Sequence, residues 1–518
     1  MYIAQEKHSL DINSRKMITS FTGVAFMMRR ALLVLTGLYL AGTVLAQSRR
    51  PPLDTTVVTR HTVTIKGQRI PYRAEAGMQP VWDRWGRPIA TMFYVYYERE
   101  DVQDRSQRPL IFSFNGGPGS ASVWMHIGYT GPRRVRIDPE GFPVQPYGIE
   151  ENPHAILDVA DIVYVDPVNT GFSRILSDTV DRRQFFGVNE DIAYLADWIA
   201  AWVSRHGRWR SPKFLIGESY GTTRVAGLAS ALQERHWMYL NGVILVSPTG
   251  LGIERDGPVG QALLLPYYAA AAWYHRKLTP ELQQRDLEAL LPEVEAFTVE
   301  TYLPALVRGG FLEPERRRQI ARQVATYAGI SEQVVLQYNL AVPRNVFWKE
   351  LLRDEGFTIG RLDSRYRGID RQAAGERFDH DPALSAWNHA FTPAINYYLR
   401  EVLGFQTDLE YWIFGPVRPW NREGNETGEQ LRRAMAQNPY LHVLVQAGYF
   451  DGGTDYFSAK YTLWQLDPSG KLRDRLFFKG YRSGHMMYLR EEDLATANDD
   501  LRDFIRKALE AARTPARY

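Results

Sequence analysis

The residues with the clearest chemical potential are Gly217-Glu218-Ser219-Tyr220-Gly221. The apolar run 214–216 precedes this pentapeptide and a helical pattern begins near Thr223, so the serine lies in the strand, turn and helix context of a nucleophile elbow. A glycine on each side lets the chain turn sharply without Cβ clashes, which leaves the serine hydroxyl exposed at a sheet edge. We therefore predict that Ser219 is a nucleophile. The alternative is an ordinary turn.

A serine hydroxyl needs a general base, usually a histidine that a carboxylate orients. In α/β-hydrolases these residues follow one another along the chain as Ser, acid and His. Of the 11 histidines, only His485 lies beyond residue 442, in Ser483-Gly484-His485-Met486-Met487-Tyr488 directly after the strand-like run 476–478. His485 is the predicted base. A buried histidine with a purely structural role is the alternative.

The acid is expected in the loop that follows a late strand. The apolar run 441–445 leads into Gln446-Ala447-Gly448-Tyr449-Phe450-Asp451, upstream of the predicted base. Asp451 is therefore the predicted acid. Asp455 is the alternative, but a helical pattern begins at Tyr456, so we expect Asp455 to cap that helix.

The oxyanion of a tetrahedral intermediate needs preorganised N–H donors. One donor is expected from the backbone of Tyr220, directly after the nucleophile. The other is expected from Asn115-Gly116-Gly117-Pro118-Gly119, which follows the apolar run 110–114 and whose glycines allow close backbone approach. A turn that only connects two elements is the alternative.

Short apolar runs rich in β-branched and aromatic residues alternate with helical patterns along the chain. This alternation predicts an α/β fold with a mostly parallel central sheet and helices on both faces. The early stretch 57–97 alternates polar and apolar residues, and we expect antiparallel strands there at the leading edge of the sheet. The expected later strands are 110–114, 162–165, 214–216, 243–246 and 441–445, and the expected helices include 191–203 and 223–232.

Strand signals give way to helical ones from 258 to 403, which predicts a helical insertion between two sheet strands. Such an insertion usually lies over the carboxyl edge of the sheet, where ligands bind, so we expect a lid. The hydrolase core would then comprise 47–257 and 404–518. The helices expected within the insertion include 261–275, 280–291 and 314–327, and the run Arg316-Arg317-Arg318 is expected on a solvated helix face.

The N-terminus has the pattern of a signal peptide, because Met28-Arg29-Arg30 precedes a 16-residue apolar run that ends in small residues before Gln47. We predict cleavage after Ala46, export to the periplasm or the medium, and no stable membrane association afterwards. Residues 1–26 are interpreted as an extension upstream of the true start. An uncleaved anchor is the alternative, although the run is shorter than the ~20 residues of a typical span.

Composition excludes several other functions. The 62 basic and 59 acidic residues give a formal charge of +3, which provides no electrostatic basis for nucleic acid binding. The absence of cysteine excludes disulfides, thiolate zinc sites and cysteine nucleophiles. Consecutive residues point in different directions, so Asp379-His380-Asp381 does not predict a metal site, and we expect neither metal nor cofactor. Oligomeric state is left open.

Taken together, Asn115–Gly119, Gly217–Gly221 and Gly484-His485-Met486 resemble the serine carboxypeptidase family. The stretch Asp166-Pro167-Val168-Asn169-Thr170-Gly171-Phe172-Ser173 resembles that family's Asp-x-Pro-x-Gly-x-Gly-Phe-Ser segment. By motif order the resemblance spans residues 55 to 510. It implies an α/β-hydrolase that removes the C-terminal residue of peptides with a free C-terminus through an acyl-enzyme.

Carried over residue by residue, the resemblance implies a triad of Ser219, Asp451 and His485. By the same carry-over, Gly117 and Tyr220 would form the oxyanion hole.

The resemblance also implies a site for the free C-terminal carboxylate of the substrate, formed by Asn115, the backbone of Gly116 and Glu218. An acid beside a carboxylate is favourable only when it is protonated, because like charges at close range raise a pKa and a neutral carboxyl donates a hydrogen bond. Activity that favours acidic pH is therefore expected.

The chain departs from the better-known eukaryotic members of this family. Ser113 stands where they have Trp, Ser120 stands where they have Cys, and the acid loop reads Gly-Tyr-Phe-Asp instead of Gly-Asp-x-Asp. The pattern is nearer the bacterial members, which lack the disulfides. Without the Trp, a neighbour that would fix Asn115 and Glu218 is missing.

Two functions are the alternatives to a carboxypeptidase. One is an esterase or lipase of the same fold, which would keep the triad without the carboxylate site, and the other is a non-catalytic binding module.

Overall fold

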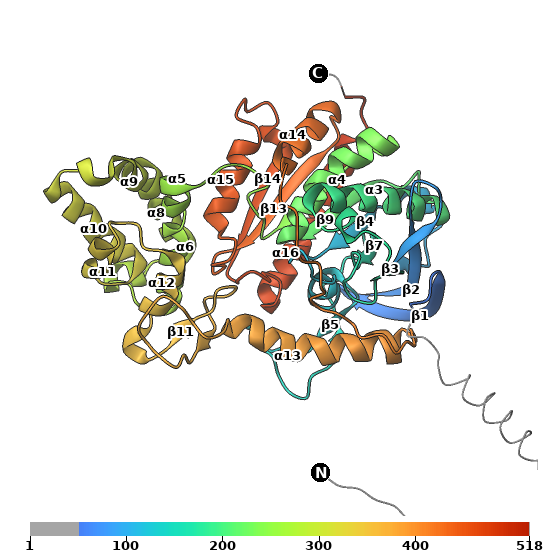
Figure 1. Cartoon of the computed structure of the whole chain (residues 1–518), viewed down its shortest axis with the longest axis horizontal. Helices are drawn as coiled ribbons and strands as arrows, with labels where there is room; N and C mark the ends of the chain where they lie inside the picture. Colours follow the sequence, from blue (N-terminus) through green and yellow to red (C-terminus); the bar gives the residue numbers. More distant parts are fainter. Residues whose placement is uncertain (1–50, 517–518) are drawn as a thin grey trace, which may run out of the picture. The chain divides into compact units, whose positions relative to one another are not determined.

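The computed structural model describes residues 51–516 (Figure 1). The predicted signal peptide lies outside the described residues. In the part that is described, the largest sheet has ten strands, in the order β1-β2-β3-β7-β4-β9-β10-β13-β14, with β8 paired to β3. The strands are β1 (Thr55–Ile65), β2 (Gln68–Trp82), β3 (Pro88–Arg99), β4 (Leu110–Phe114), β7 (Asp161–Val165), β8 (Arg174–Ile175), β9 (Lys213–Glu218), β10 (Gly242–Val246), β13 (His442–Gly448) and β14 (Leu476–Tyr481).

The sheet is antiparallel at its leading edge and parallel elsewhere. The first three strands form an antiparallel meander, and β3 pairs antiparallel with β7. From β7 through β14 every neighbouring pair is parallel. This topology is that of an α/β-hydrolase, so the predicted fold class is confirmed.

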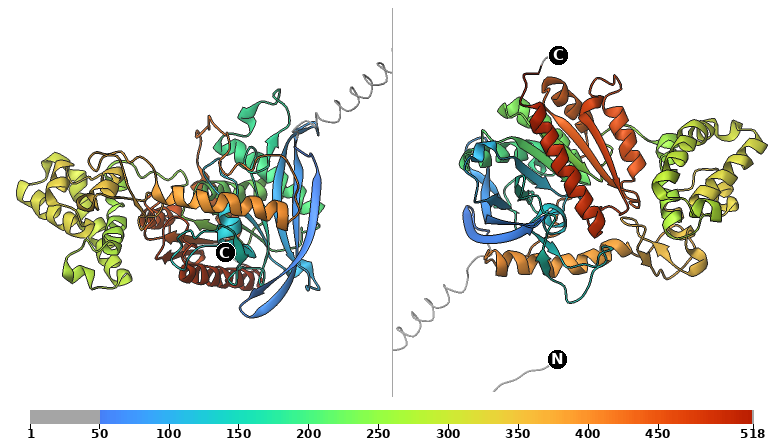
Figure 2. Two further views of the ribbon diagram at one scale, coloured as in Figure 1. Left: turned by 90° about the horizontal axis from the view of Figure 1, so that it is seen from below. Right: turned by 180° about the vertical axis from the view of Figure 1, so that it is seen from behind.

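Helices cover both faces of the parallel strands, and β4, β7 and β10 are consequently buried at every residue. Alternate side chains of these strands enter two separate apolar cores. One core is closed by α3 (Val188–Arg205), α4 (Tyr220–His236), α14 (Thr427–Gln437) and α15 (Tyr456–Leu466), and the other by α2 (Val123–Met125) and α16 (Glu491–Ala511). Figure 2 shows α16 crossing the second face of the sheet.

Between β10 and β13 the chain forms a group of helices with a core of its own (Figure 1). Within this group, α6 packs against α15 of the hydrolase core. We call this group the helical unit. It comprises α5 (Gly257–Ala262), α6 (Leu265–Tyr274), α7 (Pro280–Gln283), α8 (Leu287–Phe297), α9 (Leu303–Arg308), α10 (Pro314–Ala328), α11 (Glu332–Gln337) and α12 (Arg344–Glu350).

Two helices expected in this region are broken. The predicted helix 261–275 is interrupted after α5, because Pro266 at the start of α6 has no N–H to continue the ladder. The predicted helix 280–291 is divided into α7 and α8, since Asp286 caps a new helix by accepting a hydrogen bond from the Glu288 N–H. The predicted helix 314–327 is confirmed as α10.

The chain then returns to the hydrolase core. A short hairpin of β11 (Thr358–Ile359) and β12 (Arg367–Gly368) follows the helical unit, and its two-residue strands are too short for sequence periodicity to reveal. Next, α13 (Pro382–Tyr397) buries Trp387, Phe391 and Ile395 in the same core as α16. The segment 258–403 is therefore built from a separately packed helical unit and a helix that belongs to the main core.

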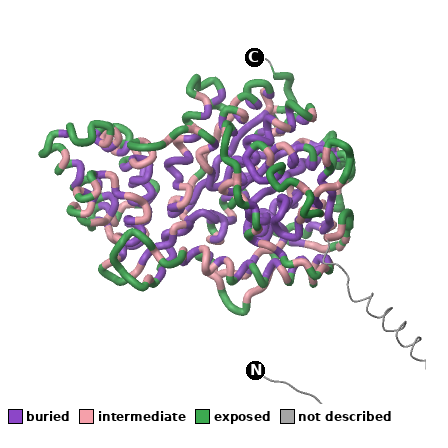
Figure 3. The backbone as a smooth tube through the Cα atoms, viewed as in Figure 1, coloured by how far each residue is buried: buried purple, intermediate pink, exposed green. Residues whose placement is uncertain are grey.

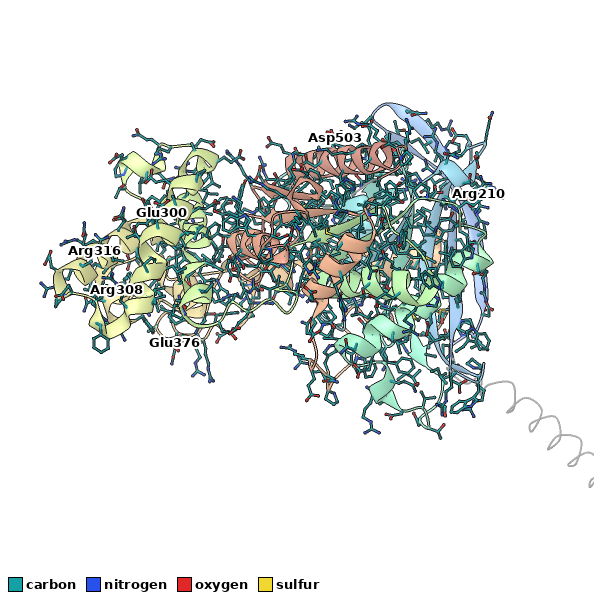
Figure 4. All side chains as sticks on the ribbon, turned by 90° about the horizontal axis from the view of Figure 1, so that it is seen from above. Arg210, Glu300, Arg308, Arg316, Glu376 and Asp503 are labelled. Atoms are coloured by element: carbon teal, nitrogen blue, oxygen red, sulfur yellow. The ribbon has the colours of Figure 1, made fainter. Side chains whose placement is uncertain are left out.

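Burial follows this organisation. Figure 3 shows buried residues concentrated in the sheet and in the helices that face it, with exposed residues on the outer turns. Figure 4 shows Arg316 on the outer side of the helical unit. Arg316 and Arg318 are exposed, as predicted for the arginine run, and Arg317 is partly exposed. Among the described residues, none of the helices combines the length and the apolar character that crossing a membrane requires.

Candidate active site

Ser219 lies on a sharp turn between the end of β9 and the start of α4. Its φ of 58° and ψ of −125° lie outside the regions that non-glycine residues favour, a conformation that costs about 1–3 kcal/mol. A Cβ on Gly217 would lie 2.2 Å from the carbonyl oxygen of Gly221, and one on Gly221 would lie 2.7 Å from that of Phe114. Both glycines are required by close backbone contacts, and the geometry is that of the predicted nucleophile elbow.

The loop after β4 passes directly against this turn. A Cβ on Gly116 would lie 2.5 Å from the Tyr220 nitrogen and 2.9 Å from Ser219 Cβ, so only glycine allows the approach. Gly117 has a φ of 103°, which is also a glycine conformation. As the first residue of α4, Tyr220 has no partner for its N–H within the helix. The backbones expected to donate to an oxyanion are thus brought next to the nucleophile.

His485 is hydrogen-bonded to Asp451. Its Nδ1 lies 2.7 Å from Asp451 Oδ2, and both side chains are buried. The backbone of His485 is held at both ends, since its N–H donates to the Leu362 carbonyl at 2.7 Å and its carbonyl accepts from Ser247 Oγ at 2.7 Å. Because Nδ1 faces Asp451, Nε2 is the ring nitrogen left for the nucleophile.

The carboxylate of Asp451 is surrounded by donors. Oδ1 accepts from the Gly453 N–H at 2.7 Å and the Thr454 N–H at 3.0 Å, while Oδ2 accepts from Thr454 Oγ1 at 2.7 Å. Burial by itself would raise the pKa of Asp451, but His485 and these donors bring the pKa below its ordinary value. Burial would likewise lower the pKa of His485, yet Asp451 raises it above the ordinary value. Asp455 instead caps α15, as predicted.

A pocket of about 200 Å³ brings Ser219 and His485 together with Gly116, Gly117 and Glu218. Its remaining lining residues are Ser120, Trp124, Arg361, Leu362, Leu384, Phe414 and Met486. A larger pocket of about 360 Å³ lies between the β2–β3 turn and α3 and contains none of the predicted site residues. The arrangement of reactive groups, rather than volume, therefore identifies the smaller pocket as the candidate active site.

Glu218 is a buried lining residue of this pocket and accepts hydrogen bonds from neutral donors. Asn115 Nδ2 donates to Glu218 Oε1 at 2.9 Å, and Asn115 Oδ1 accepts from the Met125 N–H at 3.0 Å, which orients the amide. The Tyr488 hydroxyl donates a short hydrogen bond to Glu218 Oε2. Burial raises the pKa of Glu218 to about 7, against the opposing influence of His485, Tyr488 and Asn115. The pKa is raised as expected, and burial is the largest cause.

Tyr488 is the neighbour that sequence reasoning missed. We expected the missing Trp to leave Asn115 and Glu218 without support, but Tyr488 contacts the acid from the His485 loop and stacks on Tyr129 with 4.8 Å between ring centroids. Its position three residues after His485, within the same motif, was the available signal. Sequence reasoning also missed Thr454. Its hydroxyl donates to Asp451 and lies 3.2 Å from His485 Nδ1.

Two other sequence features have structural roles. Asp166 accepts a hydrogen bond from the Ser122 N–H at 2.8 Å and packs against Gly171, which ties the loop after β4 to the segment 166–173. Burial raises the pKa of Asp166 to about 7. Asp381 caps α13. Within residues 51–516 there is no group of three or more His, Asp or Glu side chains that would hold a metal ion.

Fold and site together define an α/β-hydrolase with a serine nucleophile elbow. The chain matches the family model described as serine carboxypeptidase over residues 73–275. The resemblance to that family is therefore confirmed over this region, which includes Asn115, Glu218 and Ser219, whereas Asp451 and His485 lie beyond it.

The chain is also similar, at low identity, to individual known proteins. Serine carboxypeptidase-like 36 of Arabidopsis thaliana is 27% identical over 165 residues, 31% of this chain and 32% of the relative. Serine carboxypeptidase-like 26 of Oryza sativa subsp. japonica is 27% identical over 231 residues, 40% of this chain and 41% of the relative. The alignment thus spans less than half the length of these relatives. A solved prohormone-processing carboxypeptidase from Saccharomyces cerevisiae is 14% identical, with a TM-score of 0.48, over 84% of this chain and 91% of that chain.

Proposed function

We propose that this protein is a serine-type carboxypeptidase that hydrolyses the C-terminal peptide bond of peptides through an acyl-enzyme. The observation that carries the proposal is Glu218, a buried acid directly before Ser219 that Asn115 holds in the pocket shared with His485. An esterase or lipase needs a nucleophile and a base but has no use for such an acid. A site for the substrate's free carboxylate explains it.

In the proposed reaction His485 Nε2 removes the proton from Ser219 Oγ as the hydroxyl attacks the scissile carbonyl carbon. The oxyanion that forms accepts hydrogen bonds from the N–H groups of Gly117 and Tyr220. His485 then donates the proton to the leaving amine, and the C-terminal amino acid departs. Water, deprotonated by His485, hydrolyses the acyl-enzyme. Throughout, Asp451 keeps Nδ1 protonated and stabilises the imidazolium.

The C-terminal carboxylate is proposed to bind Glu218, the Asn115 side chain and the Gly116 N–H. Below a pH of about 7 Glu218 is largely protonated and donates a hydrogen bond to the carboxylate. Above that pH two negative charges face each other in a buried site, which weakens binding. Acidic pH is therefore proposed to favour the reaction.

The remaining features of the proposal concern the whole chain. Peptides with a free C-terminus are the proposed substrates, and the protein is proposed to resemble the bacterial members of the family. Removal of residues 1–46 on export would place it in the periplasm or the medium. The segment 258–403 is proposed as an insertion between the two parts of the core, 47–257 and 404–518, in which the helical unit serves as the lid.

The decisive experiment uses two peptides of identical sequence, one with a free C-terminus and one amidated, incubated with the protein expressed from its full sequence. Mass spectrometry from pH 4 to 8 follows the products, and Ser219→Ala is the control. Stepwise loss of C-terminal residues from the free peptide alone, absent in the variant, is the expected result. Hydrolysis of a small ester through Ser219 without trimming of either peptide would instead establish an esterase. Absence of covalent labelling by a fluorophosphonate would favour a binding module.

A further inference from the structure

The loop between β11 and β12 forms one wall of the candidate active site. This loop contributes Leu362 and Arg361 to the pocket, and Arg361 is the only lysine or arginine among the lining residues. The reaction proposed above gives Arg361 no role. A permanent positive charge beside a reaction centre therefore needs its own explanation.

The backbone of Arg361 is held in place by its surroundings. Its N–H donates to Asp381 Oδ1 at 3.2 Å, and its carbonyl accepts from the Gly452 N–H at 2.9 Å. The next residue, Leu362, accepts the backbone hydrogen bond of His485. The loop is thus tied to both the Asp451 loop and the base, and the position of Arg361 relative to the pocket is defined.

The guanidinium itself is only weakly engaged. Its Nε lies 3.5 Å from Asp381 Oδ2, which is longer than a normal hydrogen bond. Asp381 already accepts from the N–H groups of Arg361, Leu362 and Ala383. In the described part of the chain the terminal nitrogens of Arg361 make no hydrogen bond, and the side chain is 39% exposed. The two terminal NH2 groups of the planar guanidinium are therefore available to donate hydrogen bonds to a ligand in the pocket.

The pocket itself indicates which part of a substrate meets Arg361. It contains Glu218 and Gly116 of the proposed carboxylate site next to Ser219 and His485. A peptide whose C-terminal carboxylate binds Glu218 and whose scissile carbonyl meets Ser219 would place its C-terminal residue in this space. Its volume of about 200 Å³ is below the 300–1,000 Å³ typical of sites for drug-sized ligands, so it suits a single residue. The other walls are largely apolar: Trp124, Leu384, Phe414 and Met486.

We propose that Arg361 selects peptides whose C-terminal residue has an acidic side chain, with its guanidinium pairing with the carboxylate of a C-terminal Glu or Asp. This inference rests on the proposed carboxypeptidase function. The apolar walls would accept the methylene groups of such a side chain, while Glu218, Asn115 and Gly116 hold the main-chain carboxylate. Guanidinium and carboxylate pair in a bidentate geometry, which adds directionality to charge.

The test compares peptides that are identical except for a C-terminal Glu, Gln or Lys. At pH 6 a Glu side chain, with an ordinary pKa of about 4.3, is ionised, whereas Glu218 is mostly protonated. We expect kcat/KM to be on the order of tenfold higher for Glu than for Gln, as befits one partly solvated charged hydrogen bond, and lowest for Lys. Added salt should reduce the ratio, because Arg361 is partly exposed.

Variants separate this role from a structural one. Arg361→Gln should bring the Glu to Gln ratio to about one, and Arg361→Lys, which keeps the charge, should retain part of it. Arg367→Gln is the matched control, since Arg367 belongs to the same hairpin, is 45% exposed, pairs with Glu355 at 3.2 Å and lies outside the pocket. This control should leave the ratio unchanged. Thermal unfolding of each variant verifies folding.

Three outcomes are distinguishable. A wild-type ratio of one overturns the selectivity while leaving the carboxypeptidase intact. An equal loss for Glu and Gln peptides in Arg361→Gln also overturns it, and assigns Arg361 to the main-chain carboxylate or to loop structure. If the wild-type protein trims no peptide at all, the proposed function itself is rejected.

Discussion

Two buried carboxyl groups of the candidate active site, Asp451 and Glu218, have opposite electrostatic surroundings. Asp451 accepts two backbone N–H groups and a hydroxyl and faces His485, and its pKa is lowered. Glu218 accepts one amide and one phenol, and its pKa is raised to about 7. Burial alone would raise both values. The comparison shows that the number and charge of the donors decide which acid is ionised.

The backbone explains the different number of donors. Asp451 lies in the loop after β13, and the following turn directs the N–H groups of Gly453 and Thr454 at its carboxylate. Glu218 is the last residue of β9 and is paired with Val246 of β10. Neighbouring amides there are committed to the sheet, so only side chains reach its carboxyl group. The pKa is consequently lowered at Asp451 and raised at Glu218.

The largest expected effect comes from removing the charge of the first carboxyl group. Asp451→Asn should lower kcat on the order of 10⁴-fold, because an amide neither fixes the required tautomer of His485 nor stabilises its protonated form. Steady-state kinetics on a peptide and on an ester should show the same loss. A decrease of less than tenfold would assign the acid role elsewhere.

The second carboxyl group should instead affect stability, in a manner that depends on pH. Burial raises the Glu218 pKa from 4.5 to about 7, so between these values the folded state binds more protons than the unfolded state and stability falls as pH rises. Glu218→Gln cannot ionise, so the variant does not lose this stability as pH rises. Its free energy of unfolding, relative to wild type, should increase by up to about 3 kcal/mol from pH 4 to pH 8.

Urea unfolding at both pH values provides the measurement. Asp166, whose pKa is also raised to about 7, titrates in both proteins and cancels in the difference. If the difference in unfolding free energy between Glu218→Gln and wild type is the same at pH 4 and pH 8, Glu218 is not the group that loses its proton.

The same titration should appear in substrate binding. For peptides with a free C-terminus, KM should rise by up to about tenfold per pH unit above pH 7, because Glu218 becomes charged. In Glu218→Gln, which cannot ionise, this rise should be absent. A wild-type KM that stays flat from pH 4 to 8 would contradict the proposed carboxylate site.

Tyr488 should adjust that titration without taking part in the chemistry. Its hydroxyl lowers the pKa of Glu218, so Tyr488→Phe should raise the pKa further and move the increase in KM upward by up to about one pH unit. Tyr481→Phe is the matched control, because Tyr481 bonds Asp500 instead. If both variants keep the wild-type dependence of KM on pH, the role of Tyr488 is limited to packing.

The smallest effect is expected at Asp455, the other candidate acid. Asp455→Ala removes the cap of α15 and should cost about 1 kcal/mol of stability by chemical denaturation. Its kcat/KM should remain near the wild-type value. A loss comparable with that of Asp451→Asn would reverse the two roles.

Local sequence was sufficient for much of the fold. The strands 110–114 and 243–246 were predictable because continuous apolar runs signal strands buried on both faces. The helix 261–275 was predicted too long, since apolar spacing continues across Leu263 and Leu264 although Pro266 restarts the helix. The hairpin of β11 and β12 was missed because two residues carry no periodicity. Yet this hairpin brings Arg361 to the pocket.

The sequence by itself determined the elbow around Ser219 and the chain order of the candidate nucleophile, acid and base, because glycine spacing and strand–turn patterns act within a few residues. Only the tertiary structure decided which acid is charged, which residue supports Glu218 and which cation enters the pocket. Tyr488 contacts Glu218 across 270 residues of chain. Burial and long-range hydrogen bonds exist only after the sheet has assembled, and they set the pKa values that no local pattern encodes.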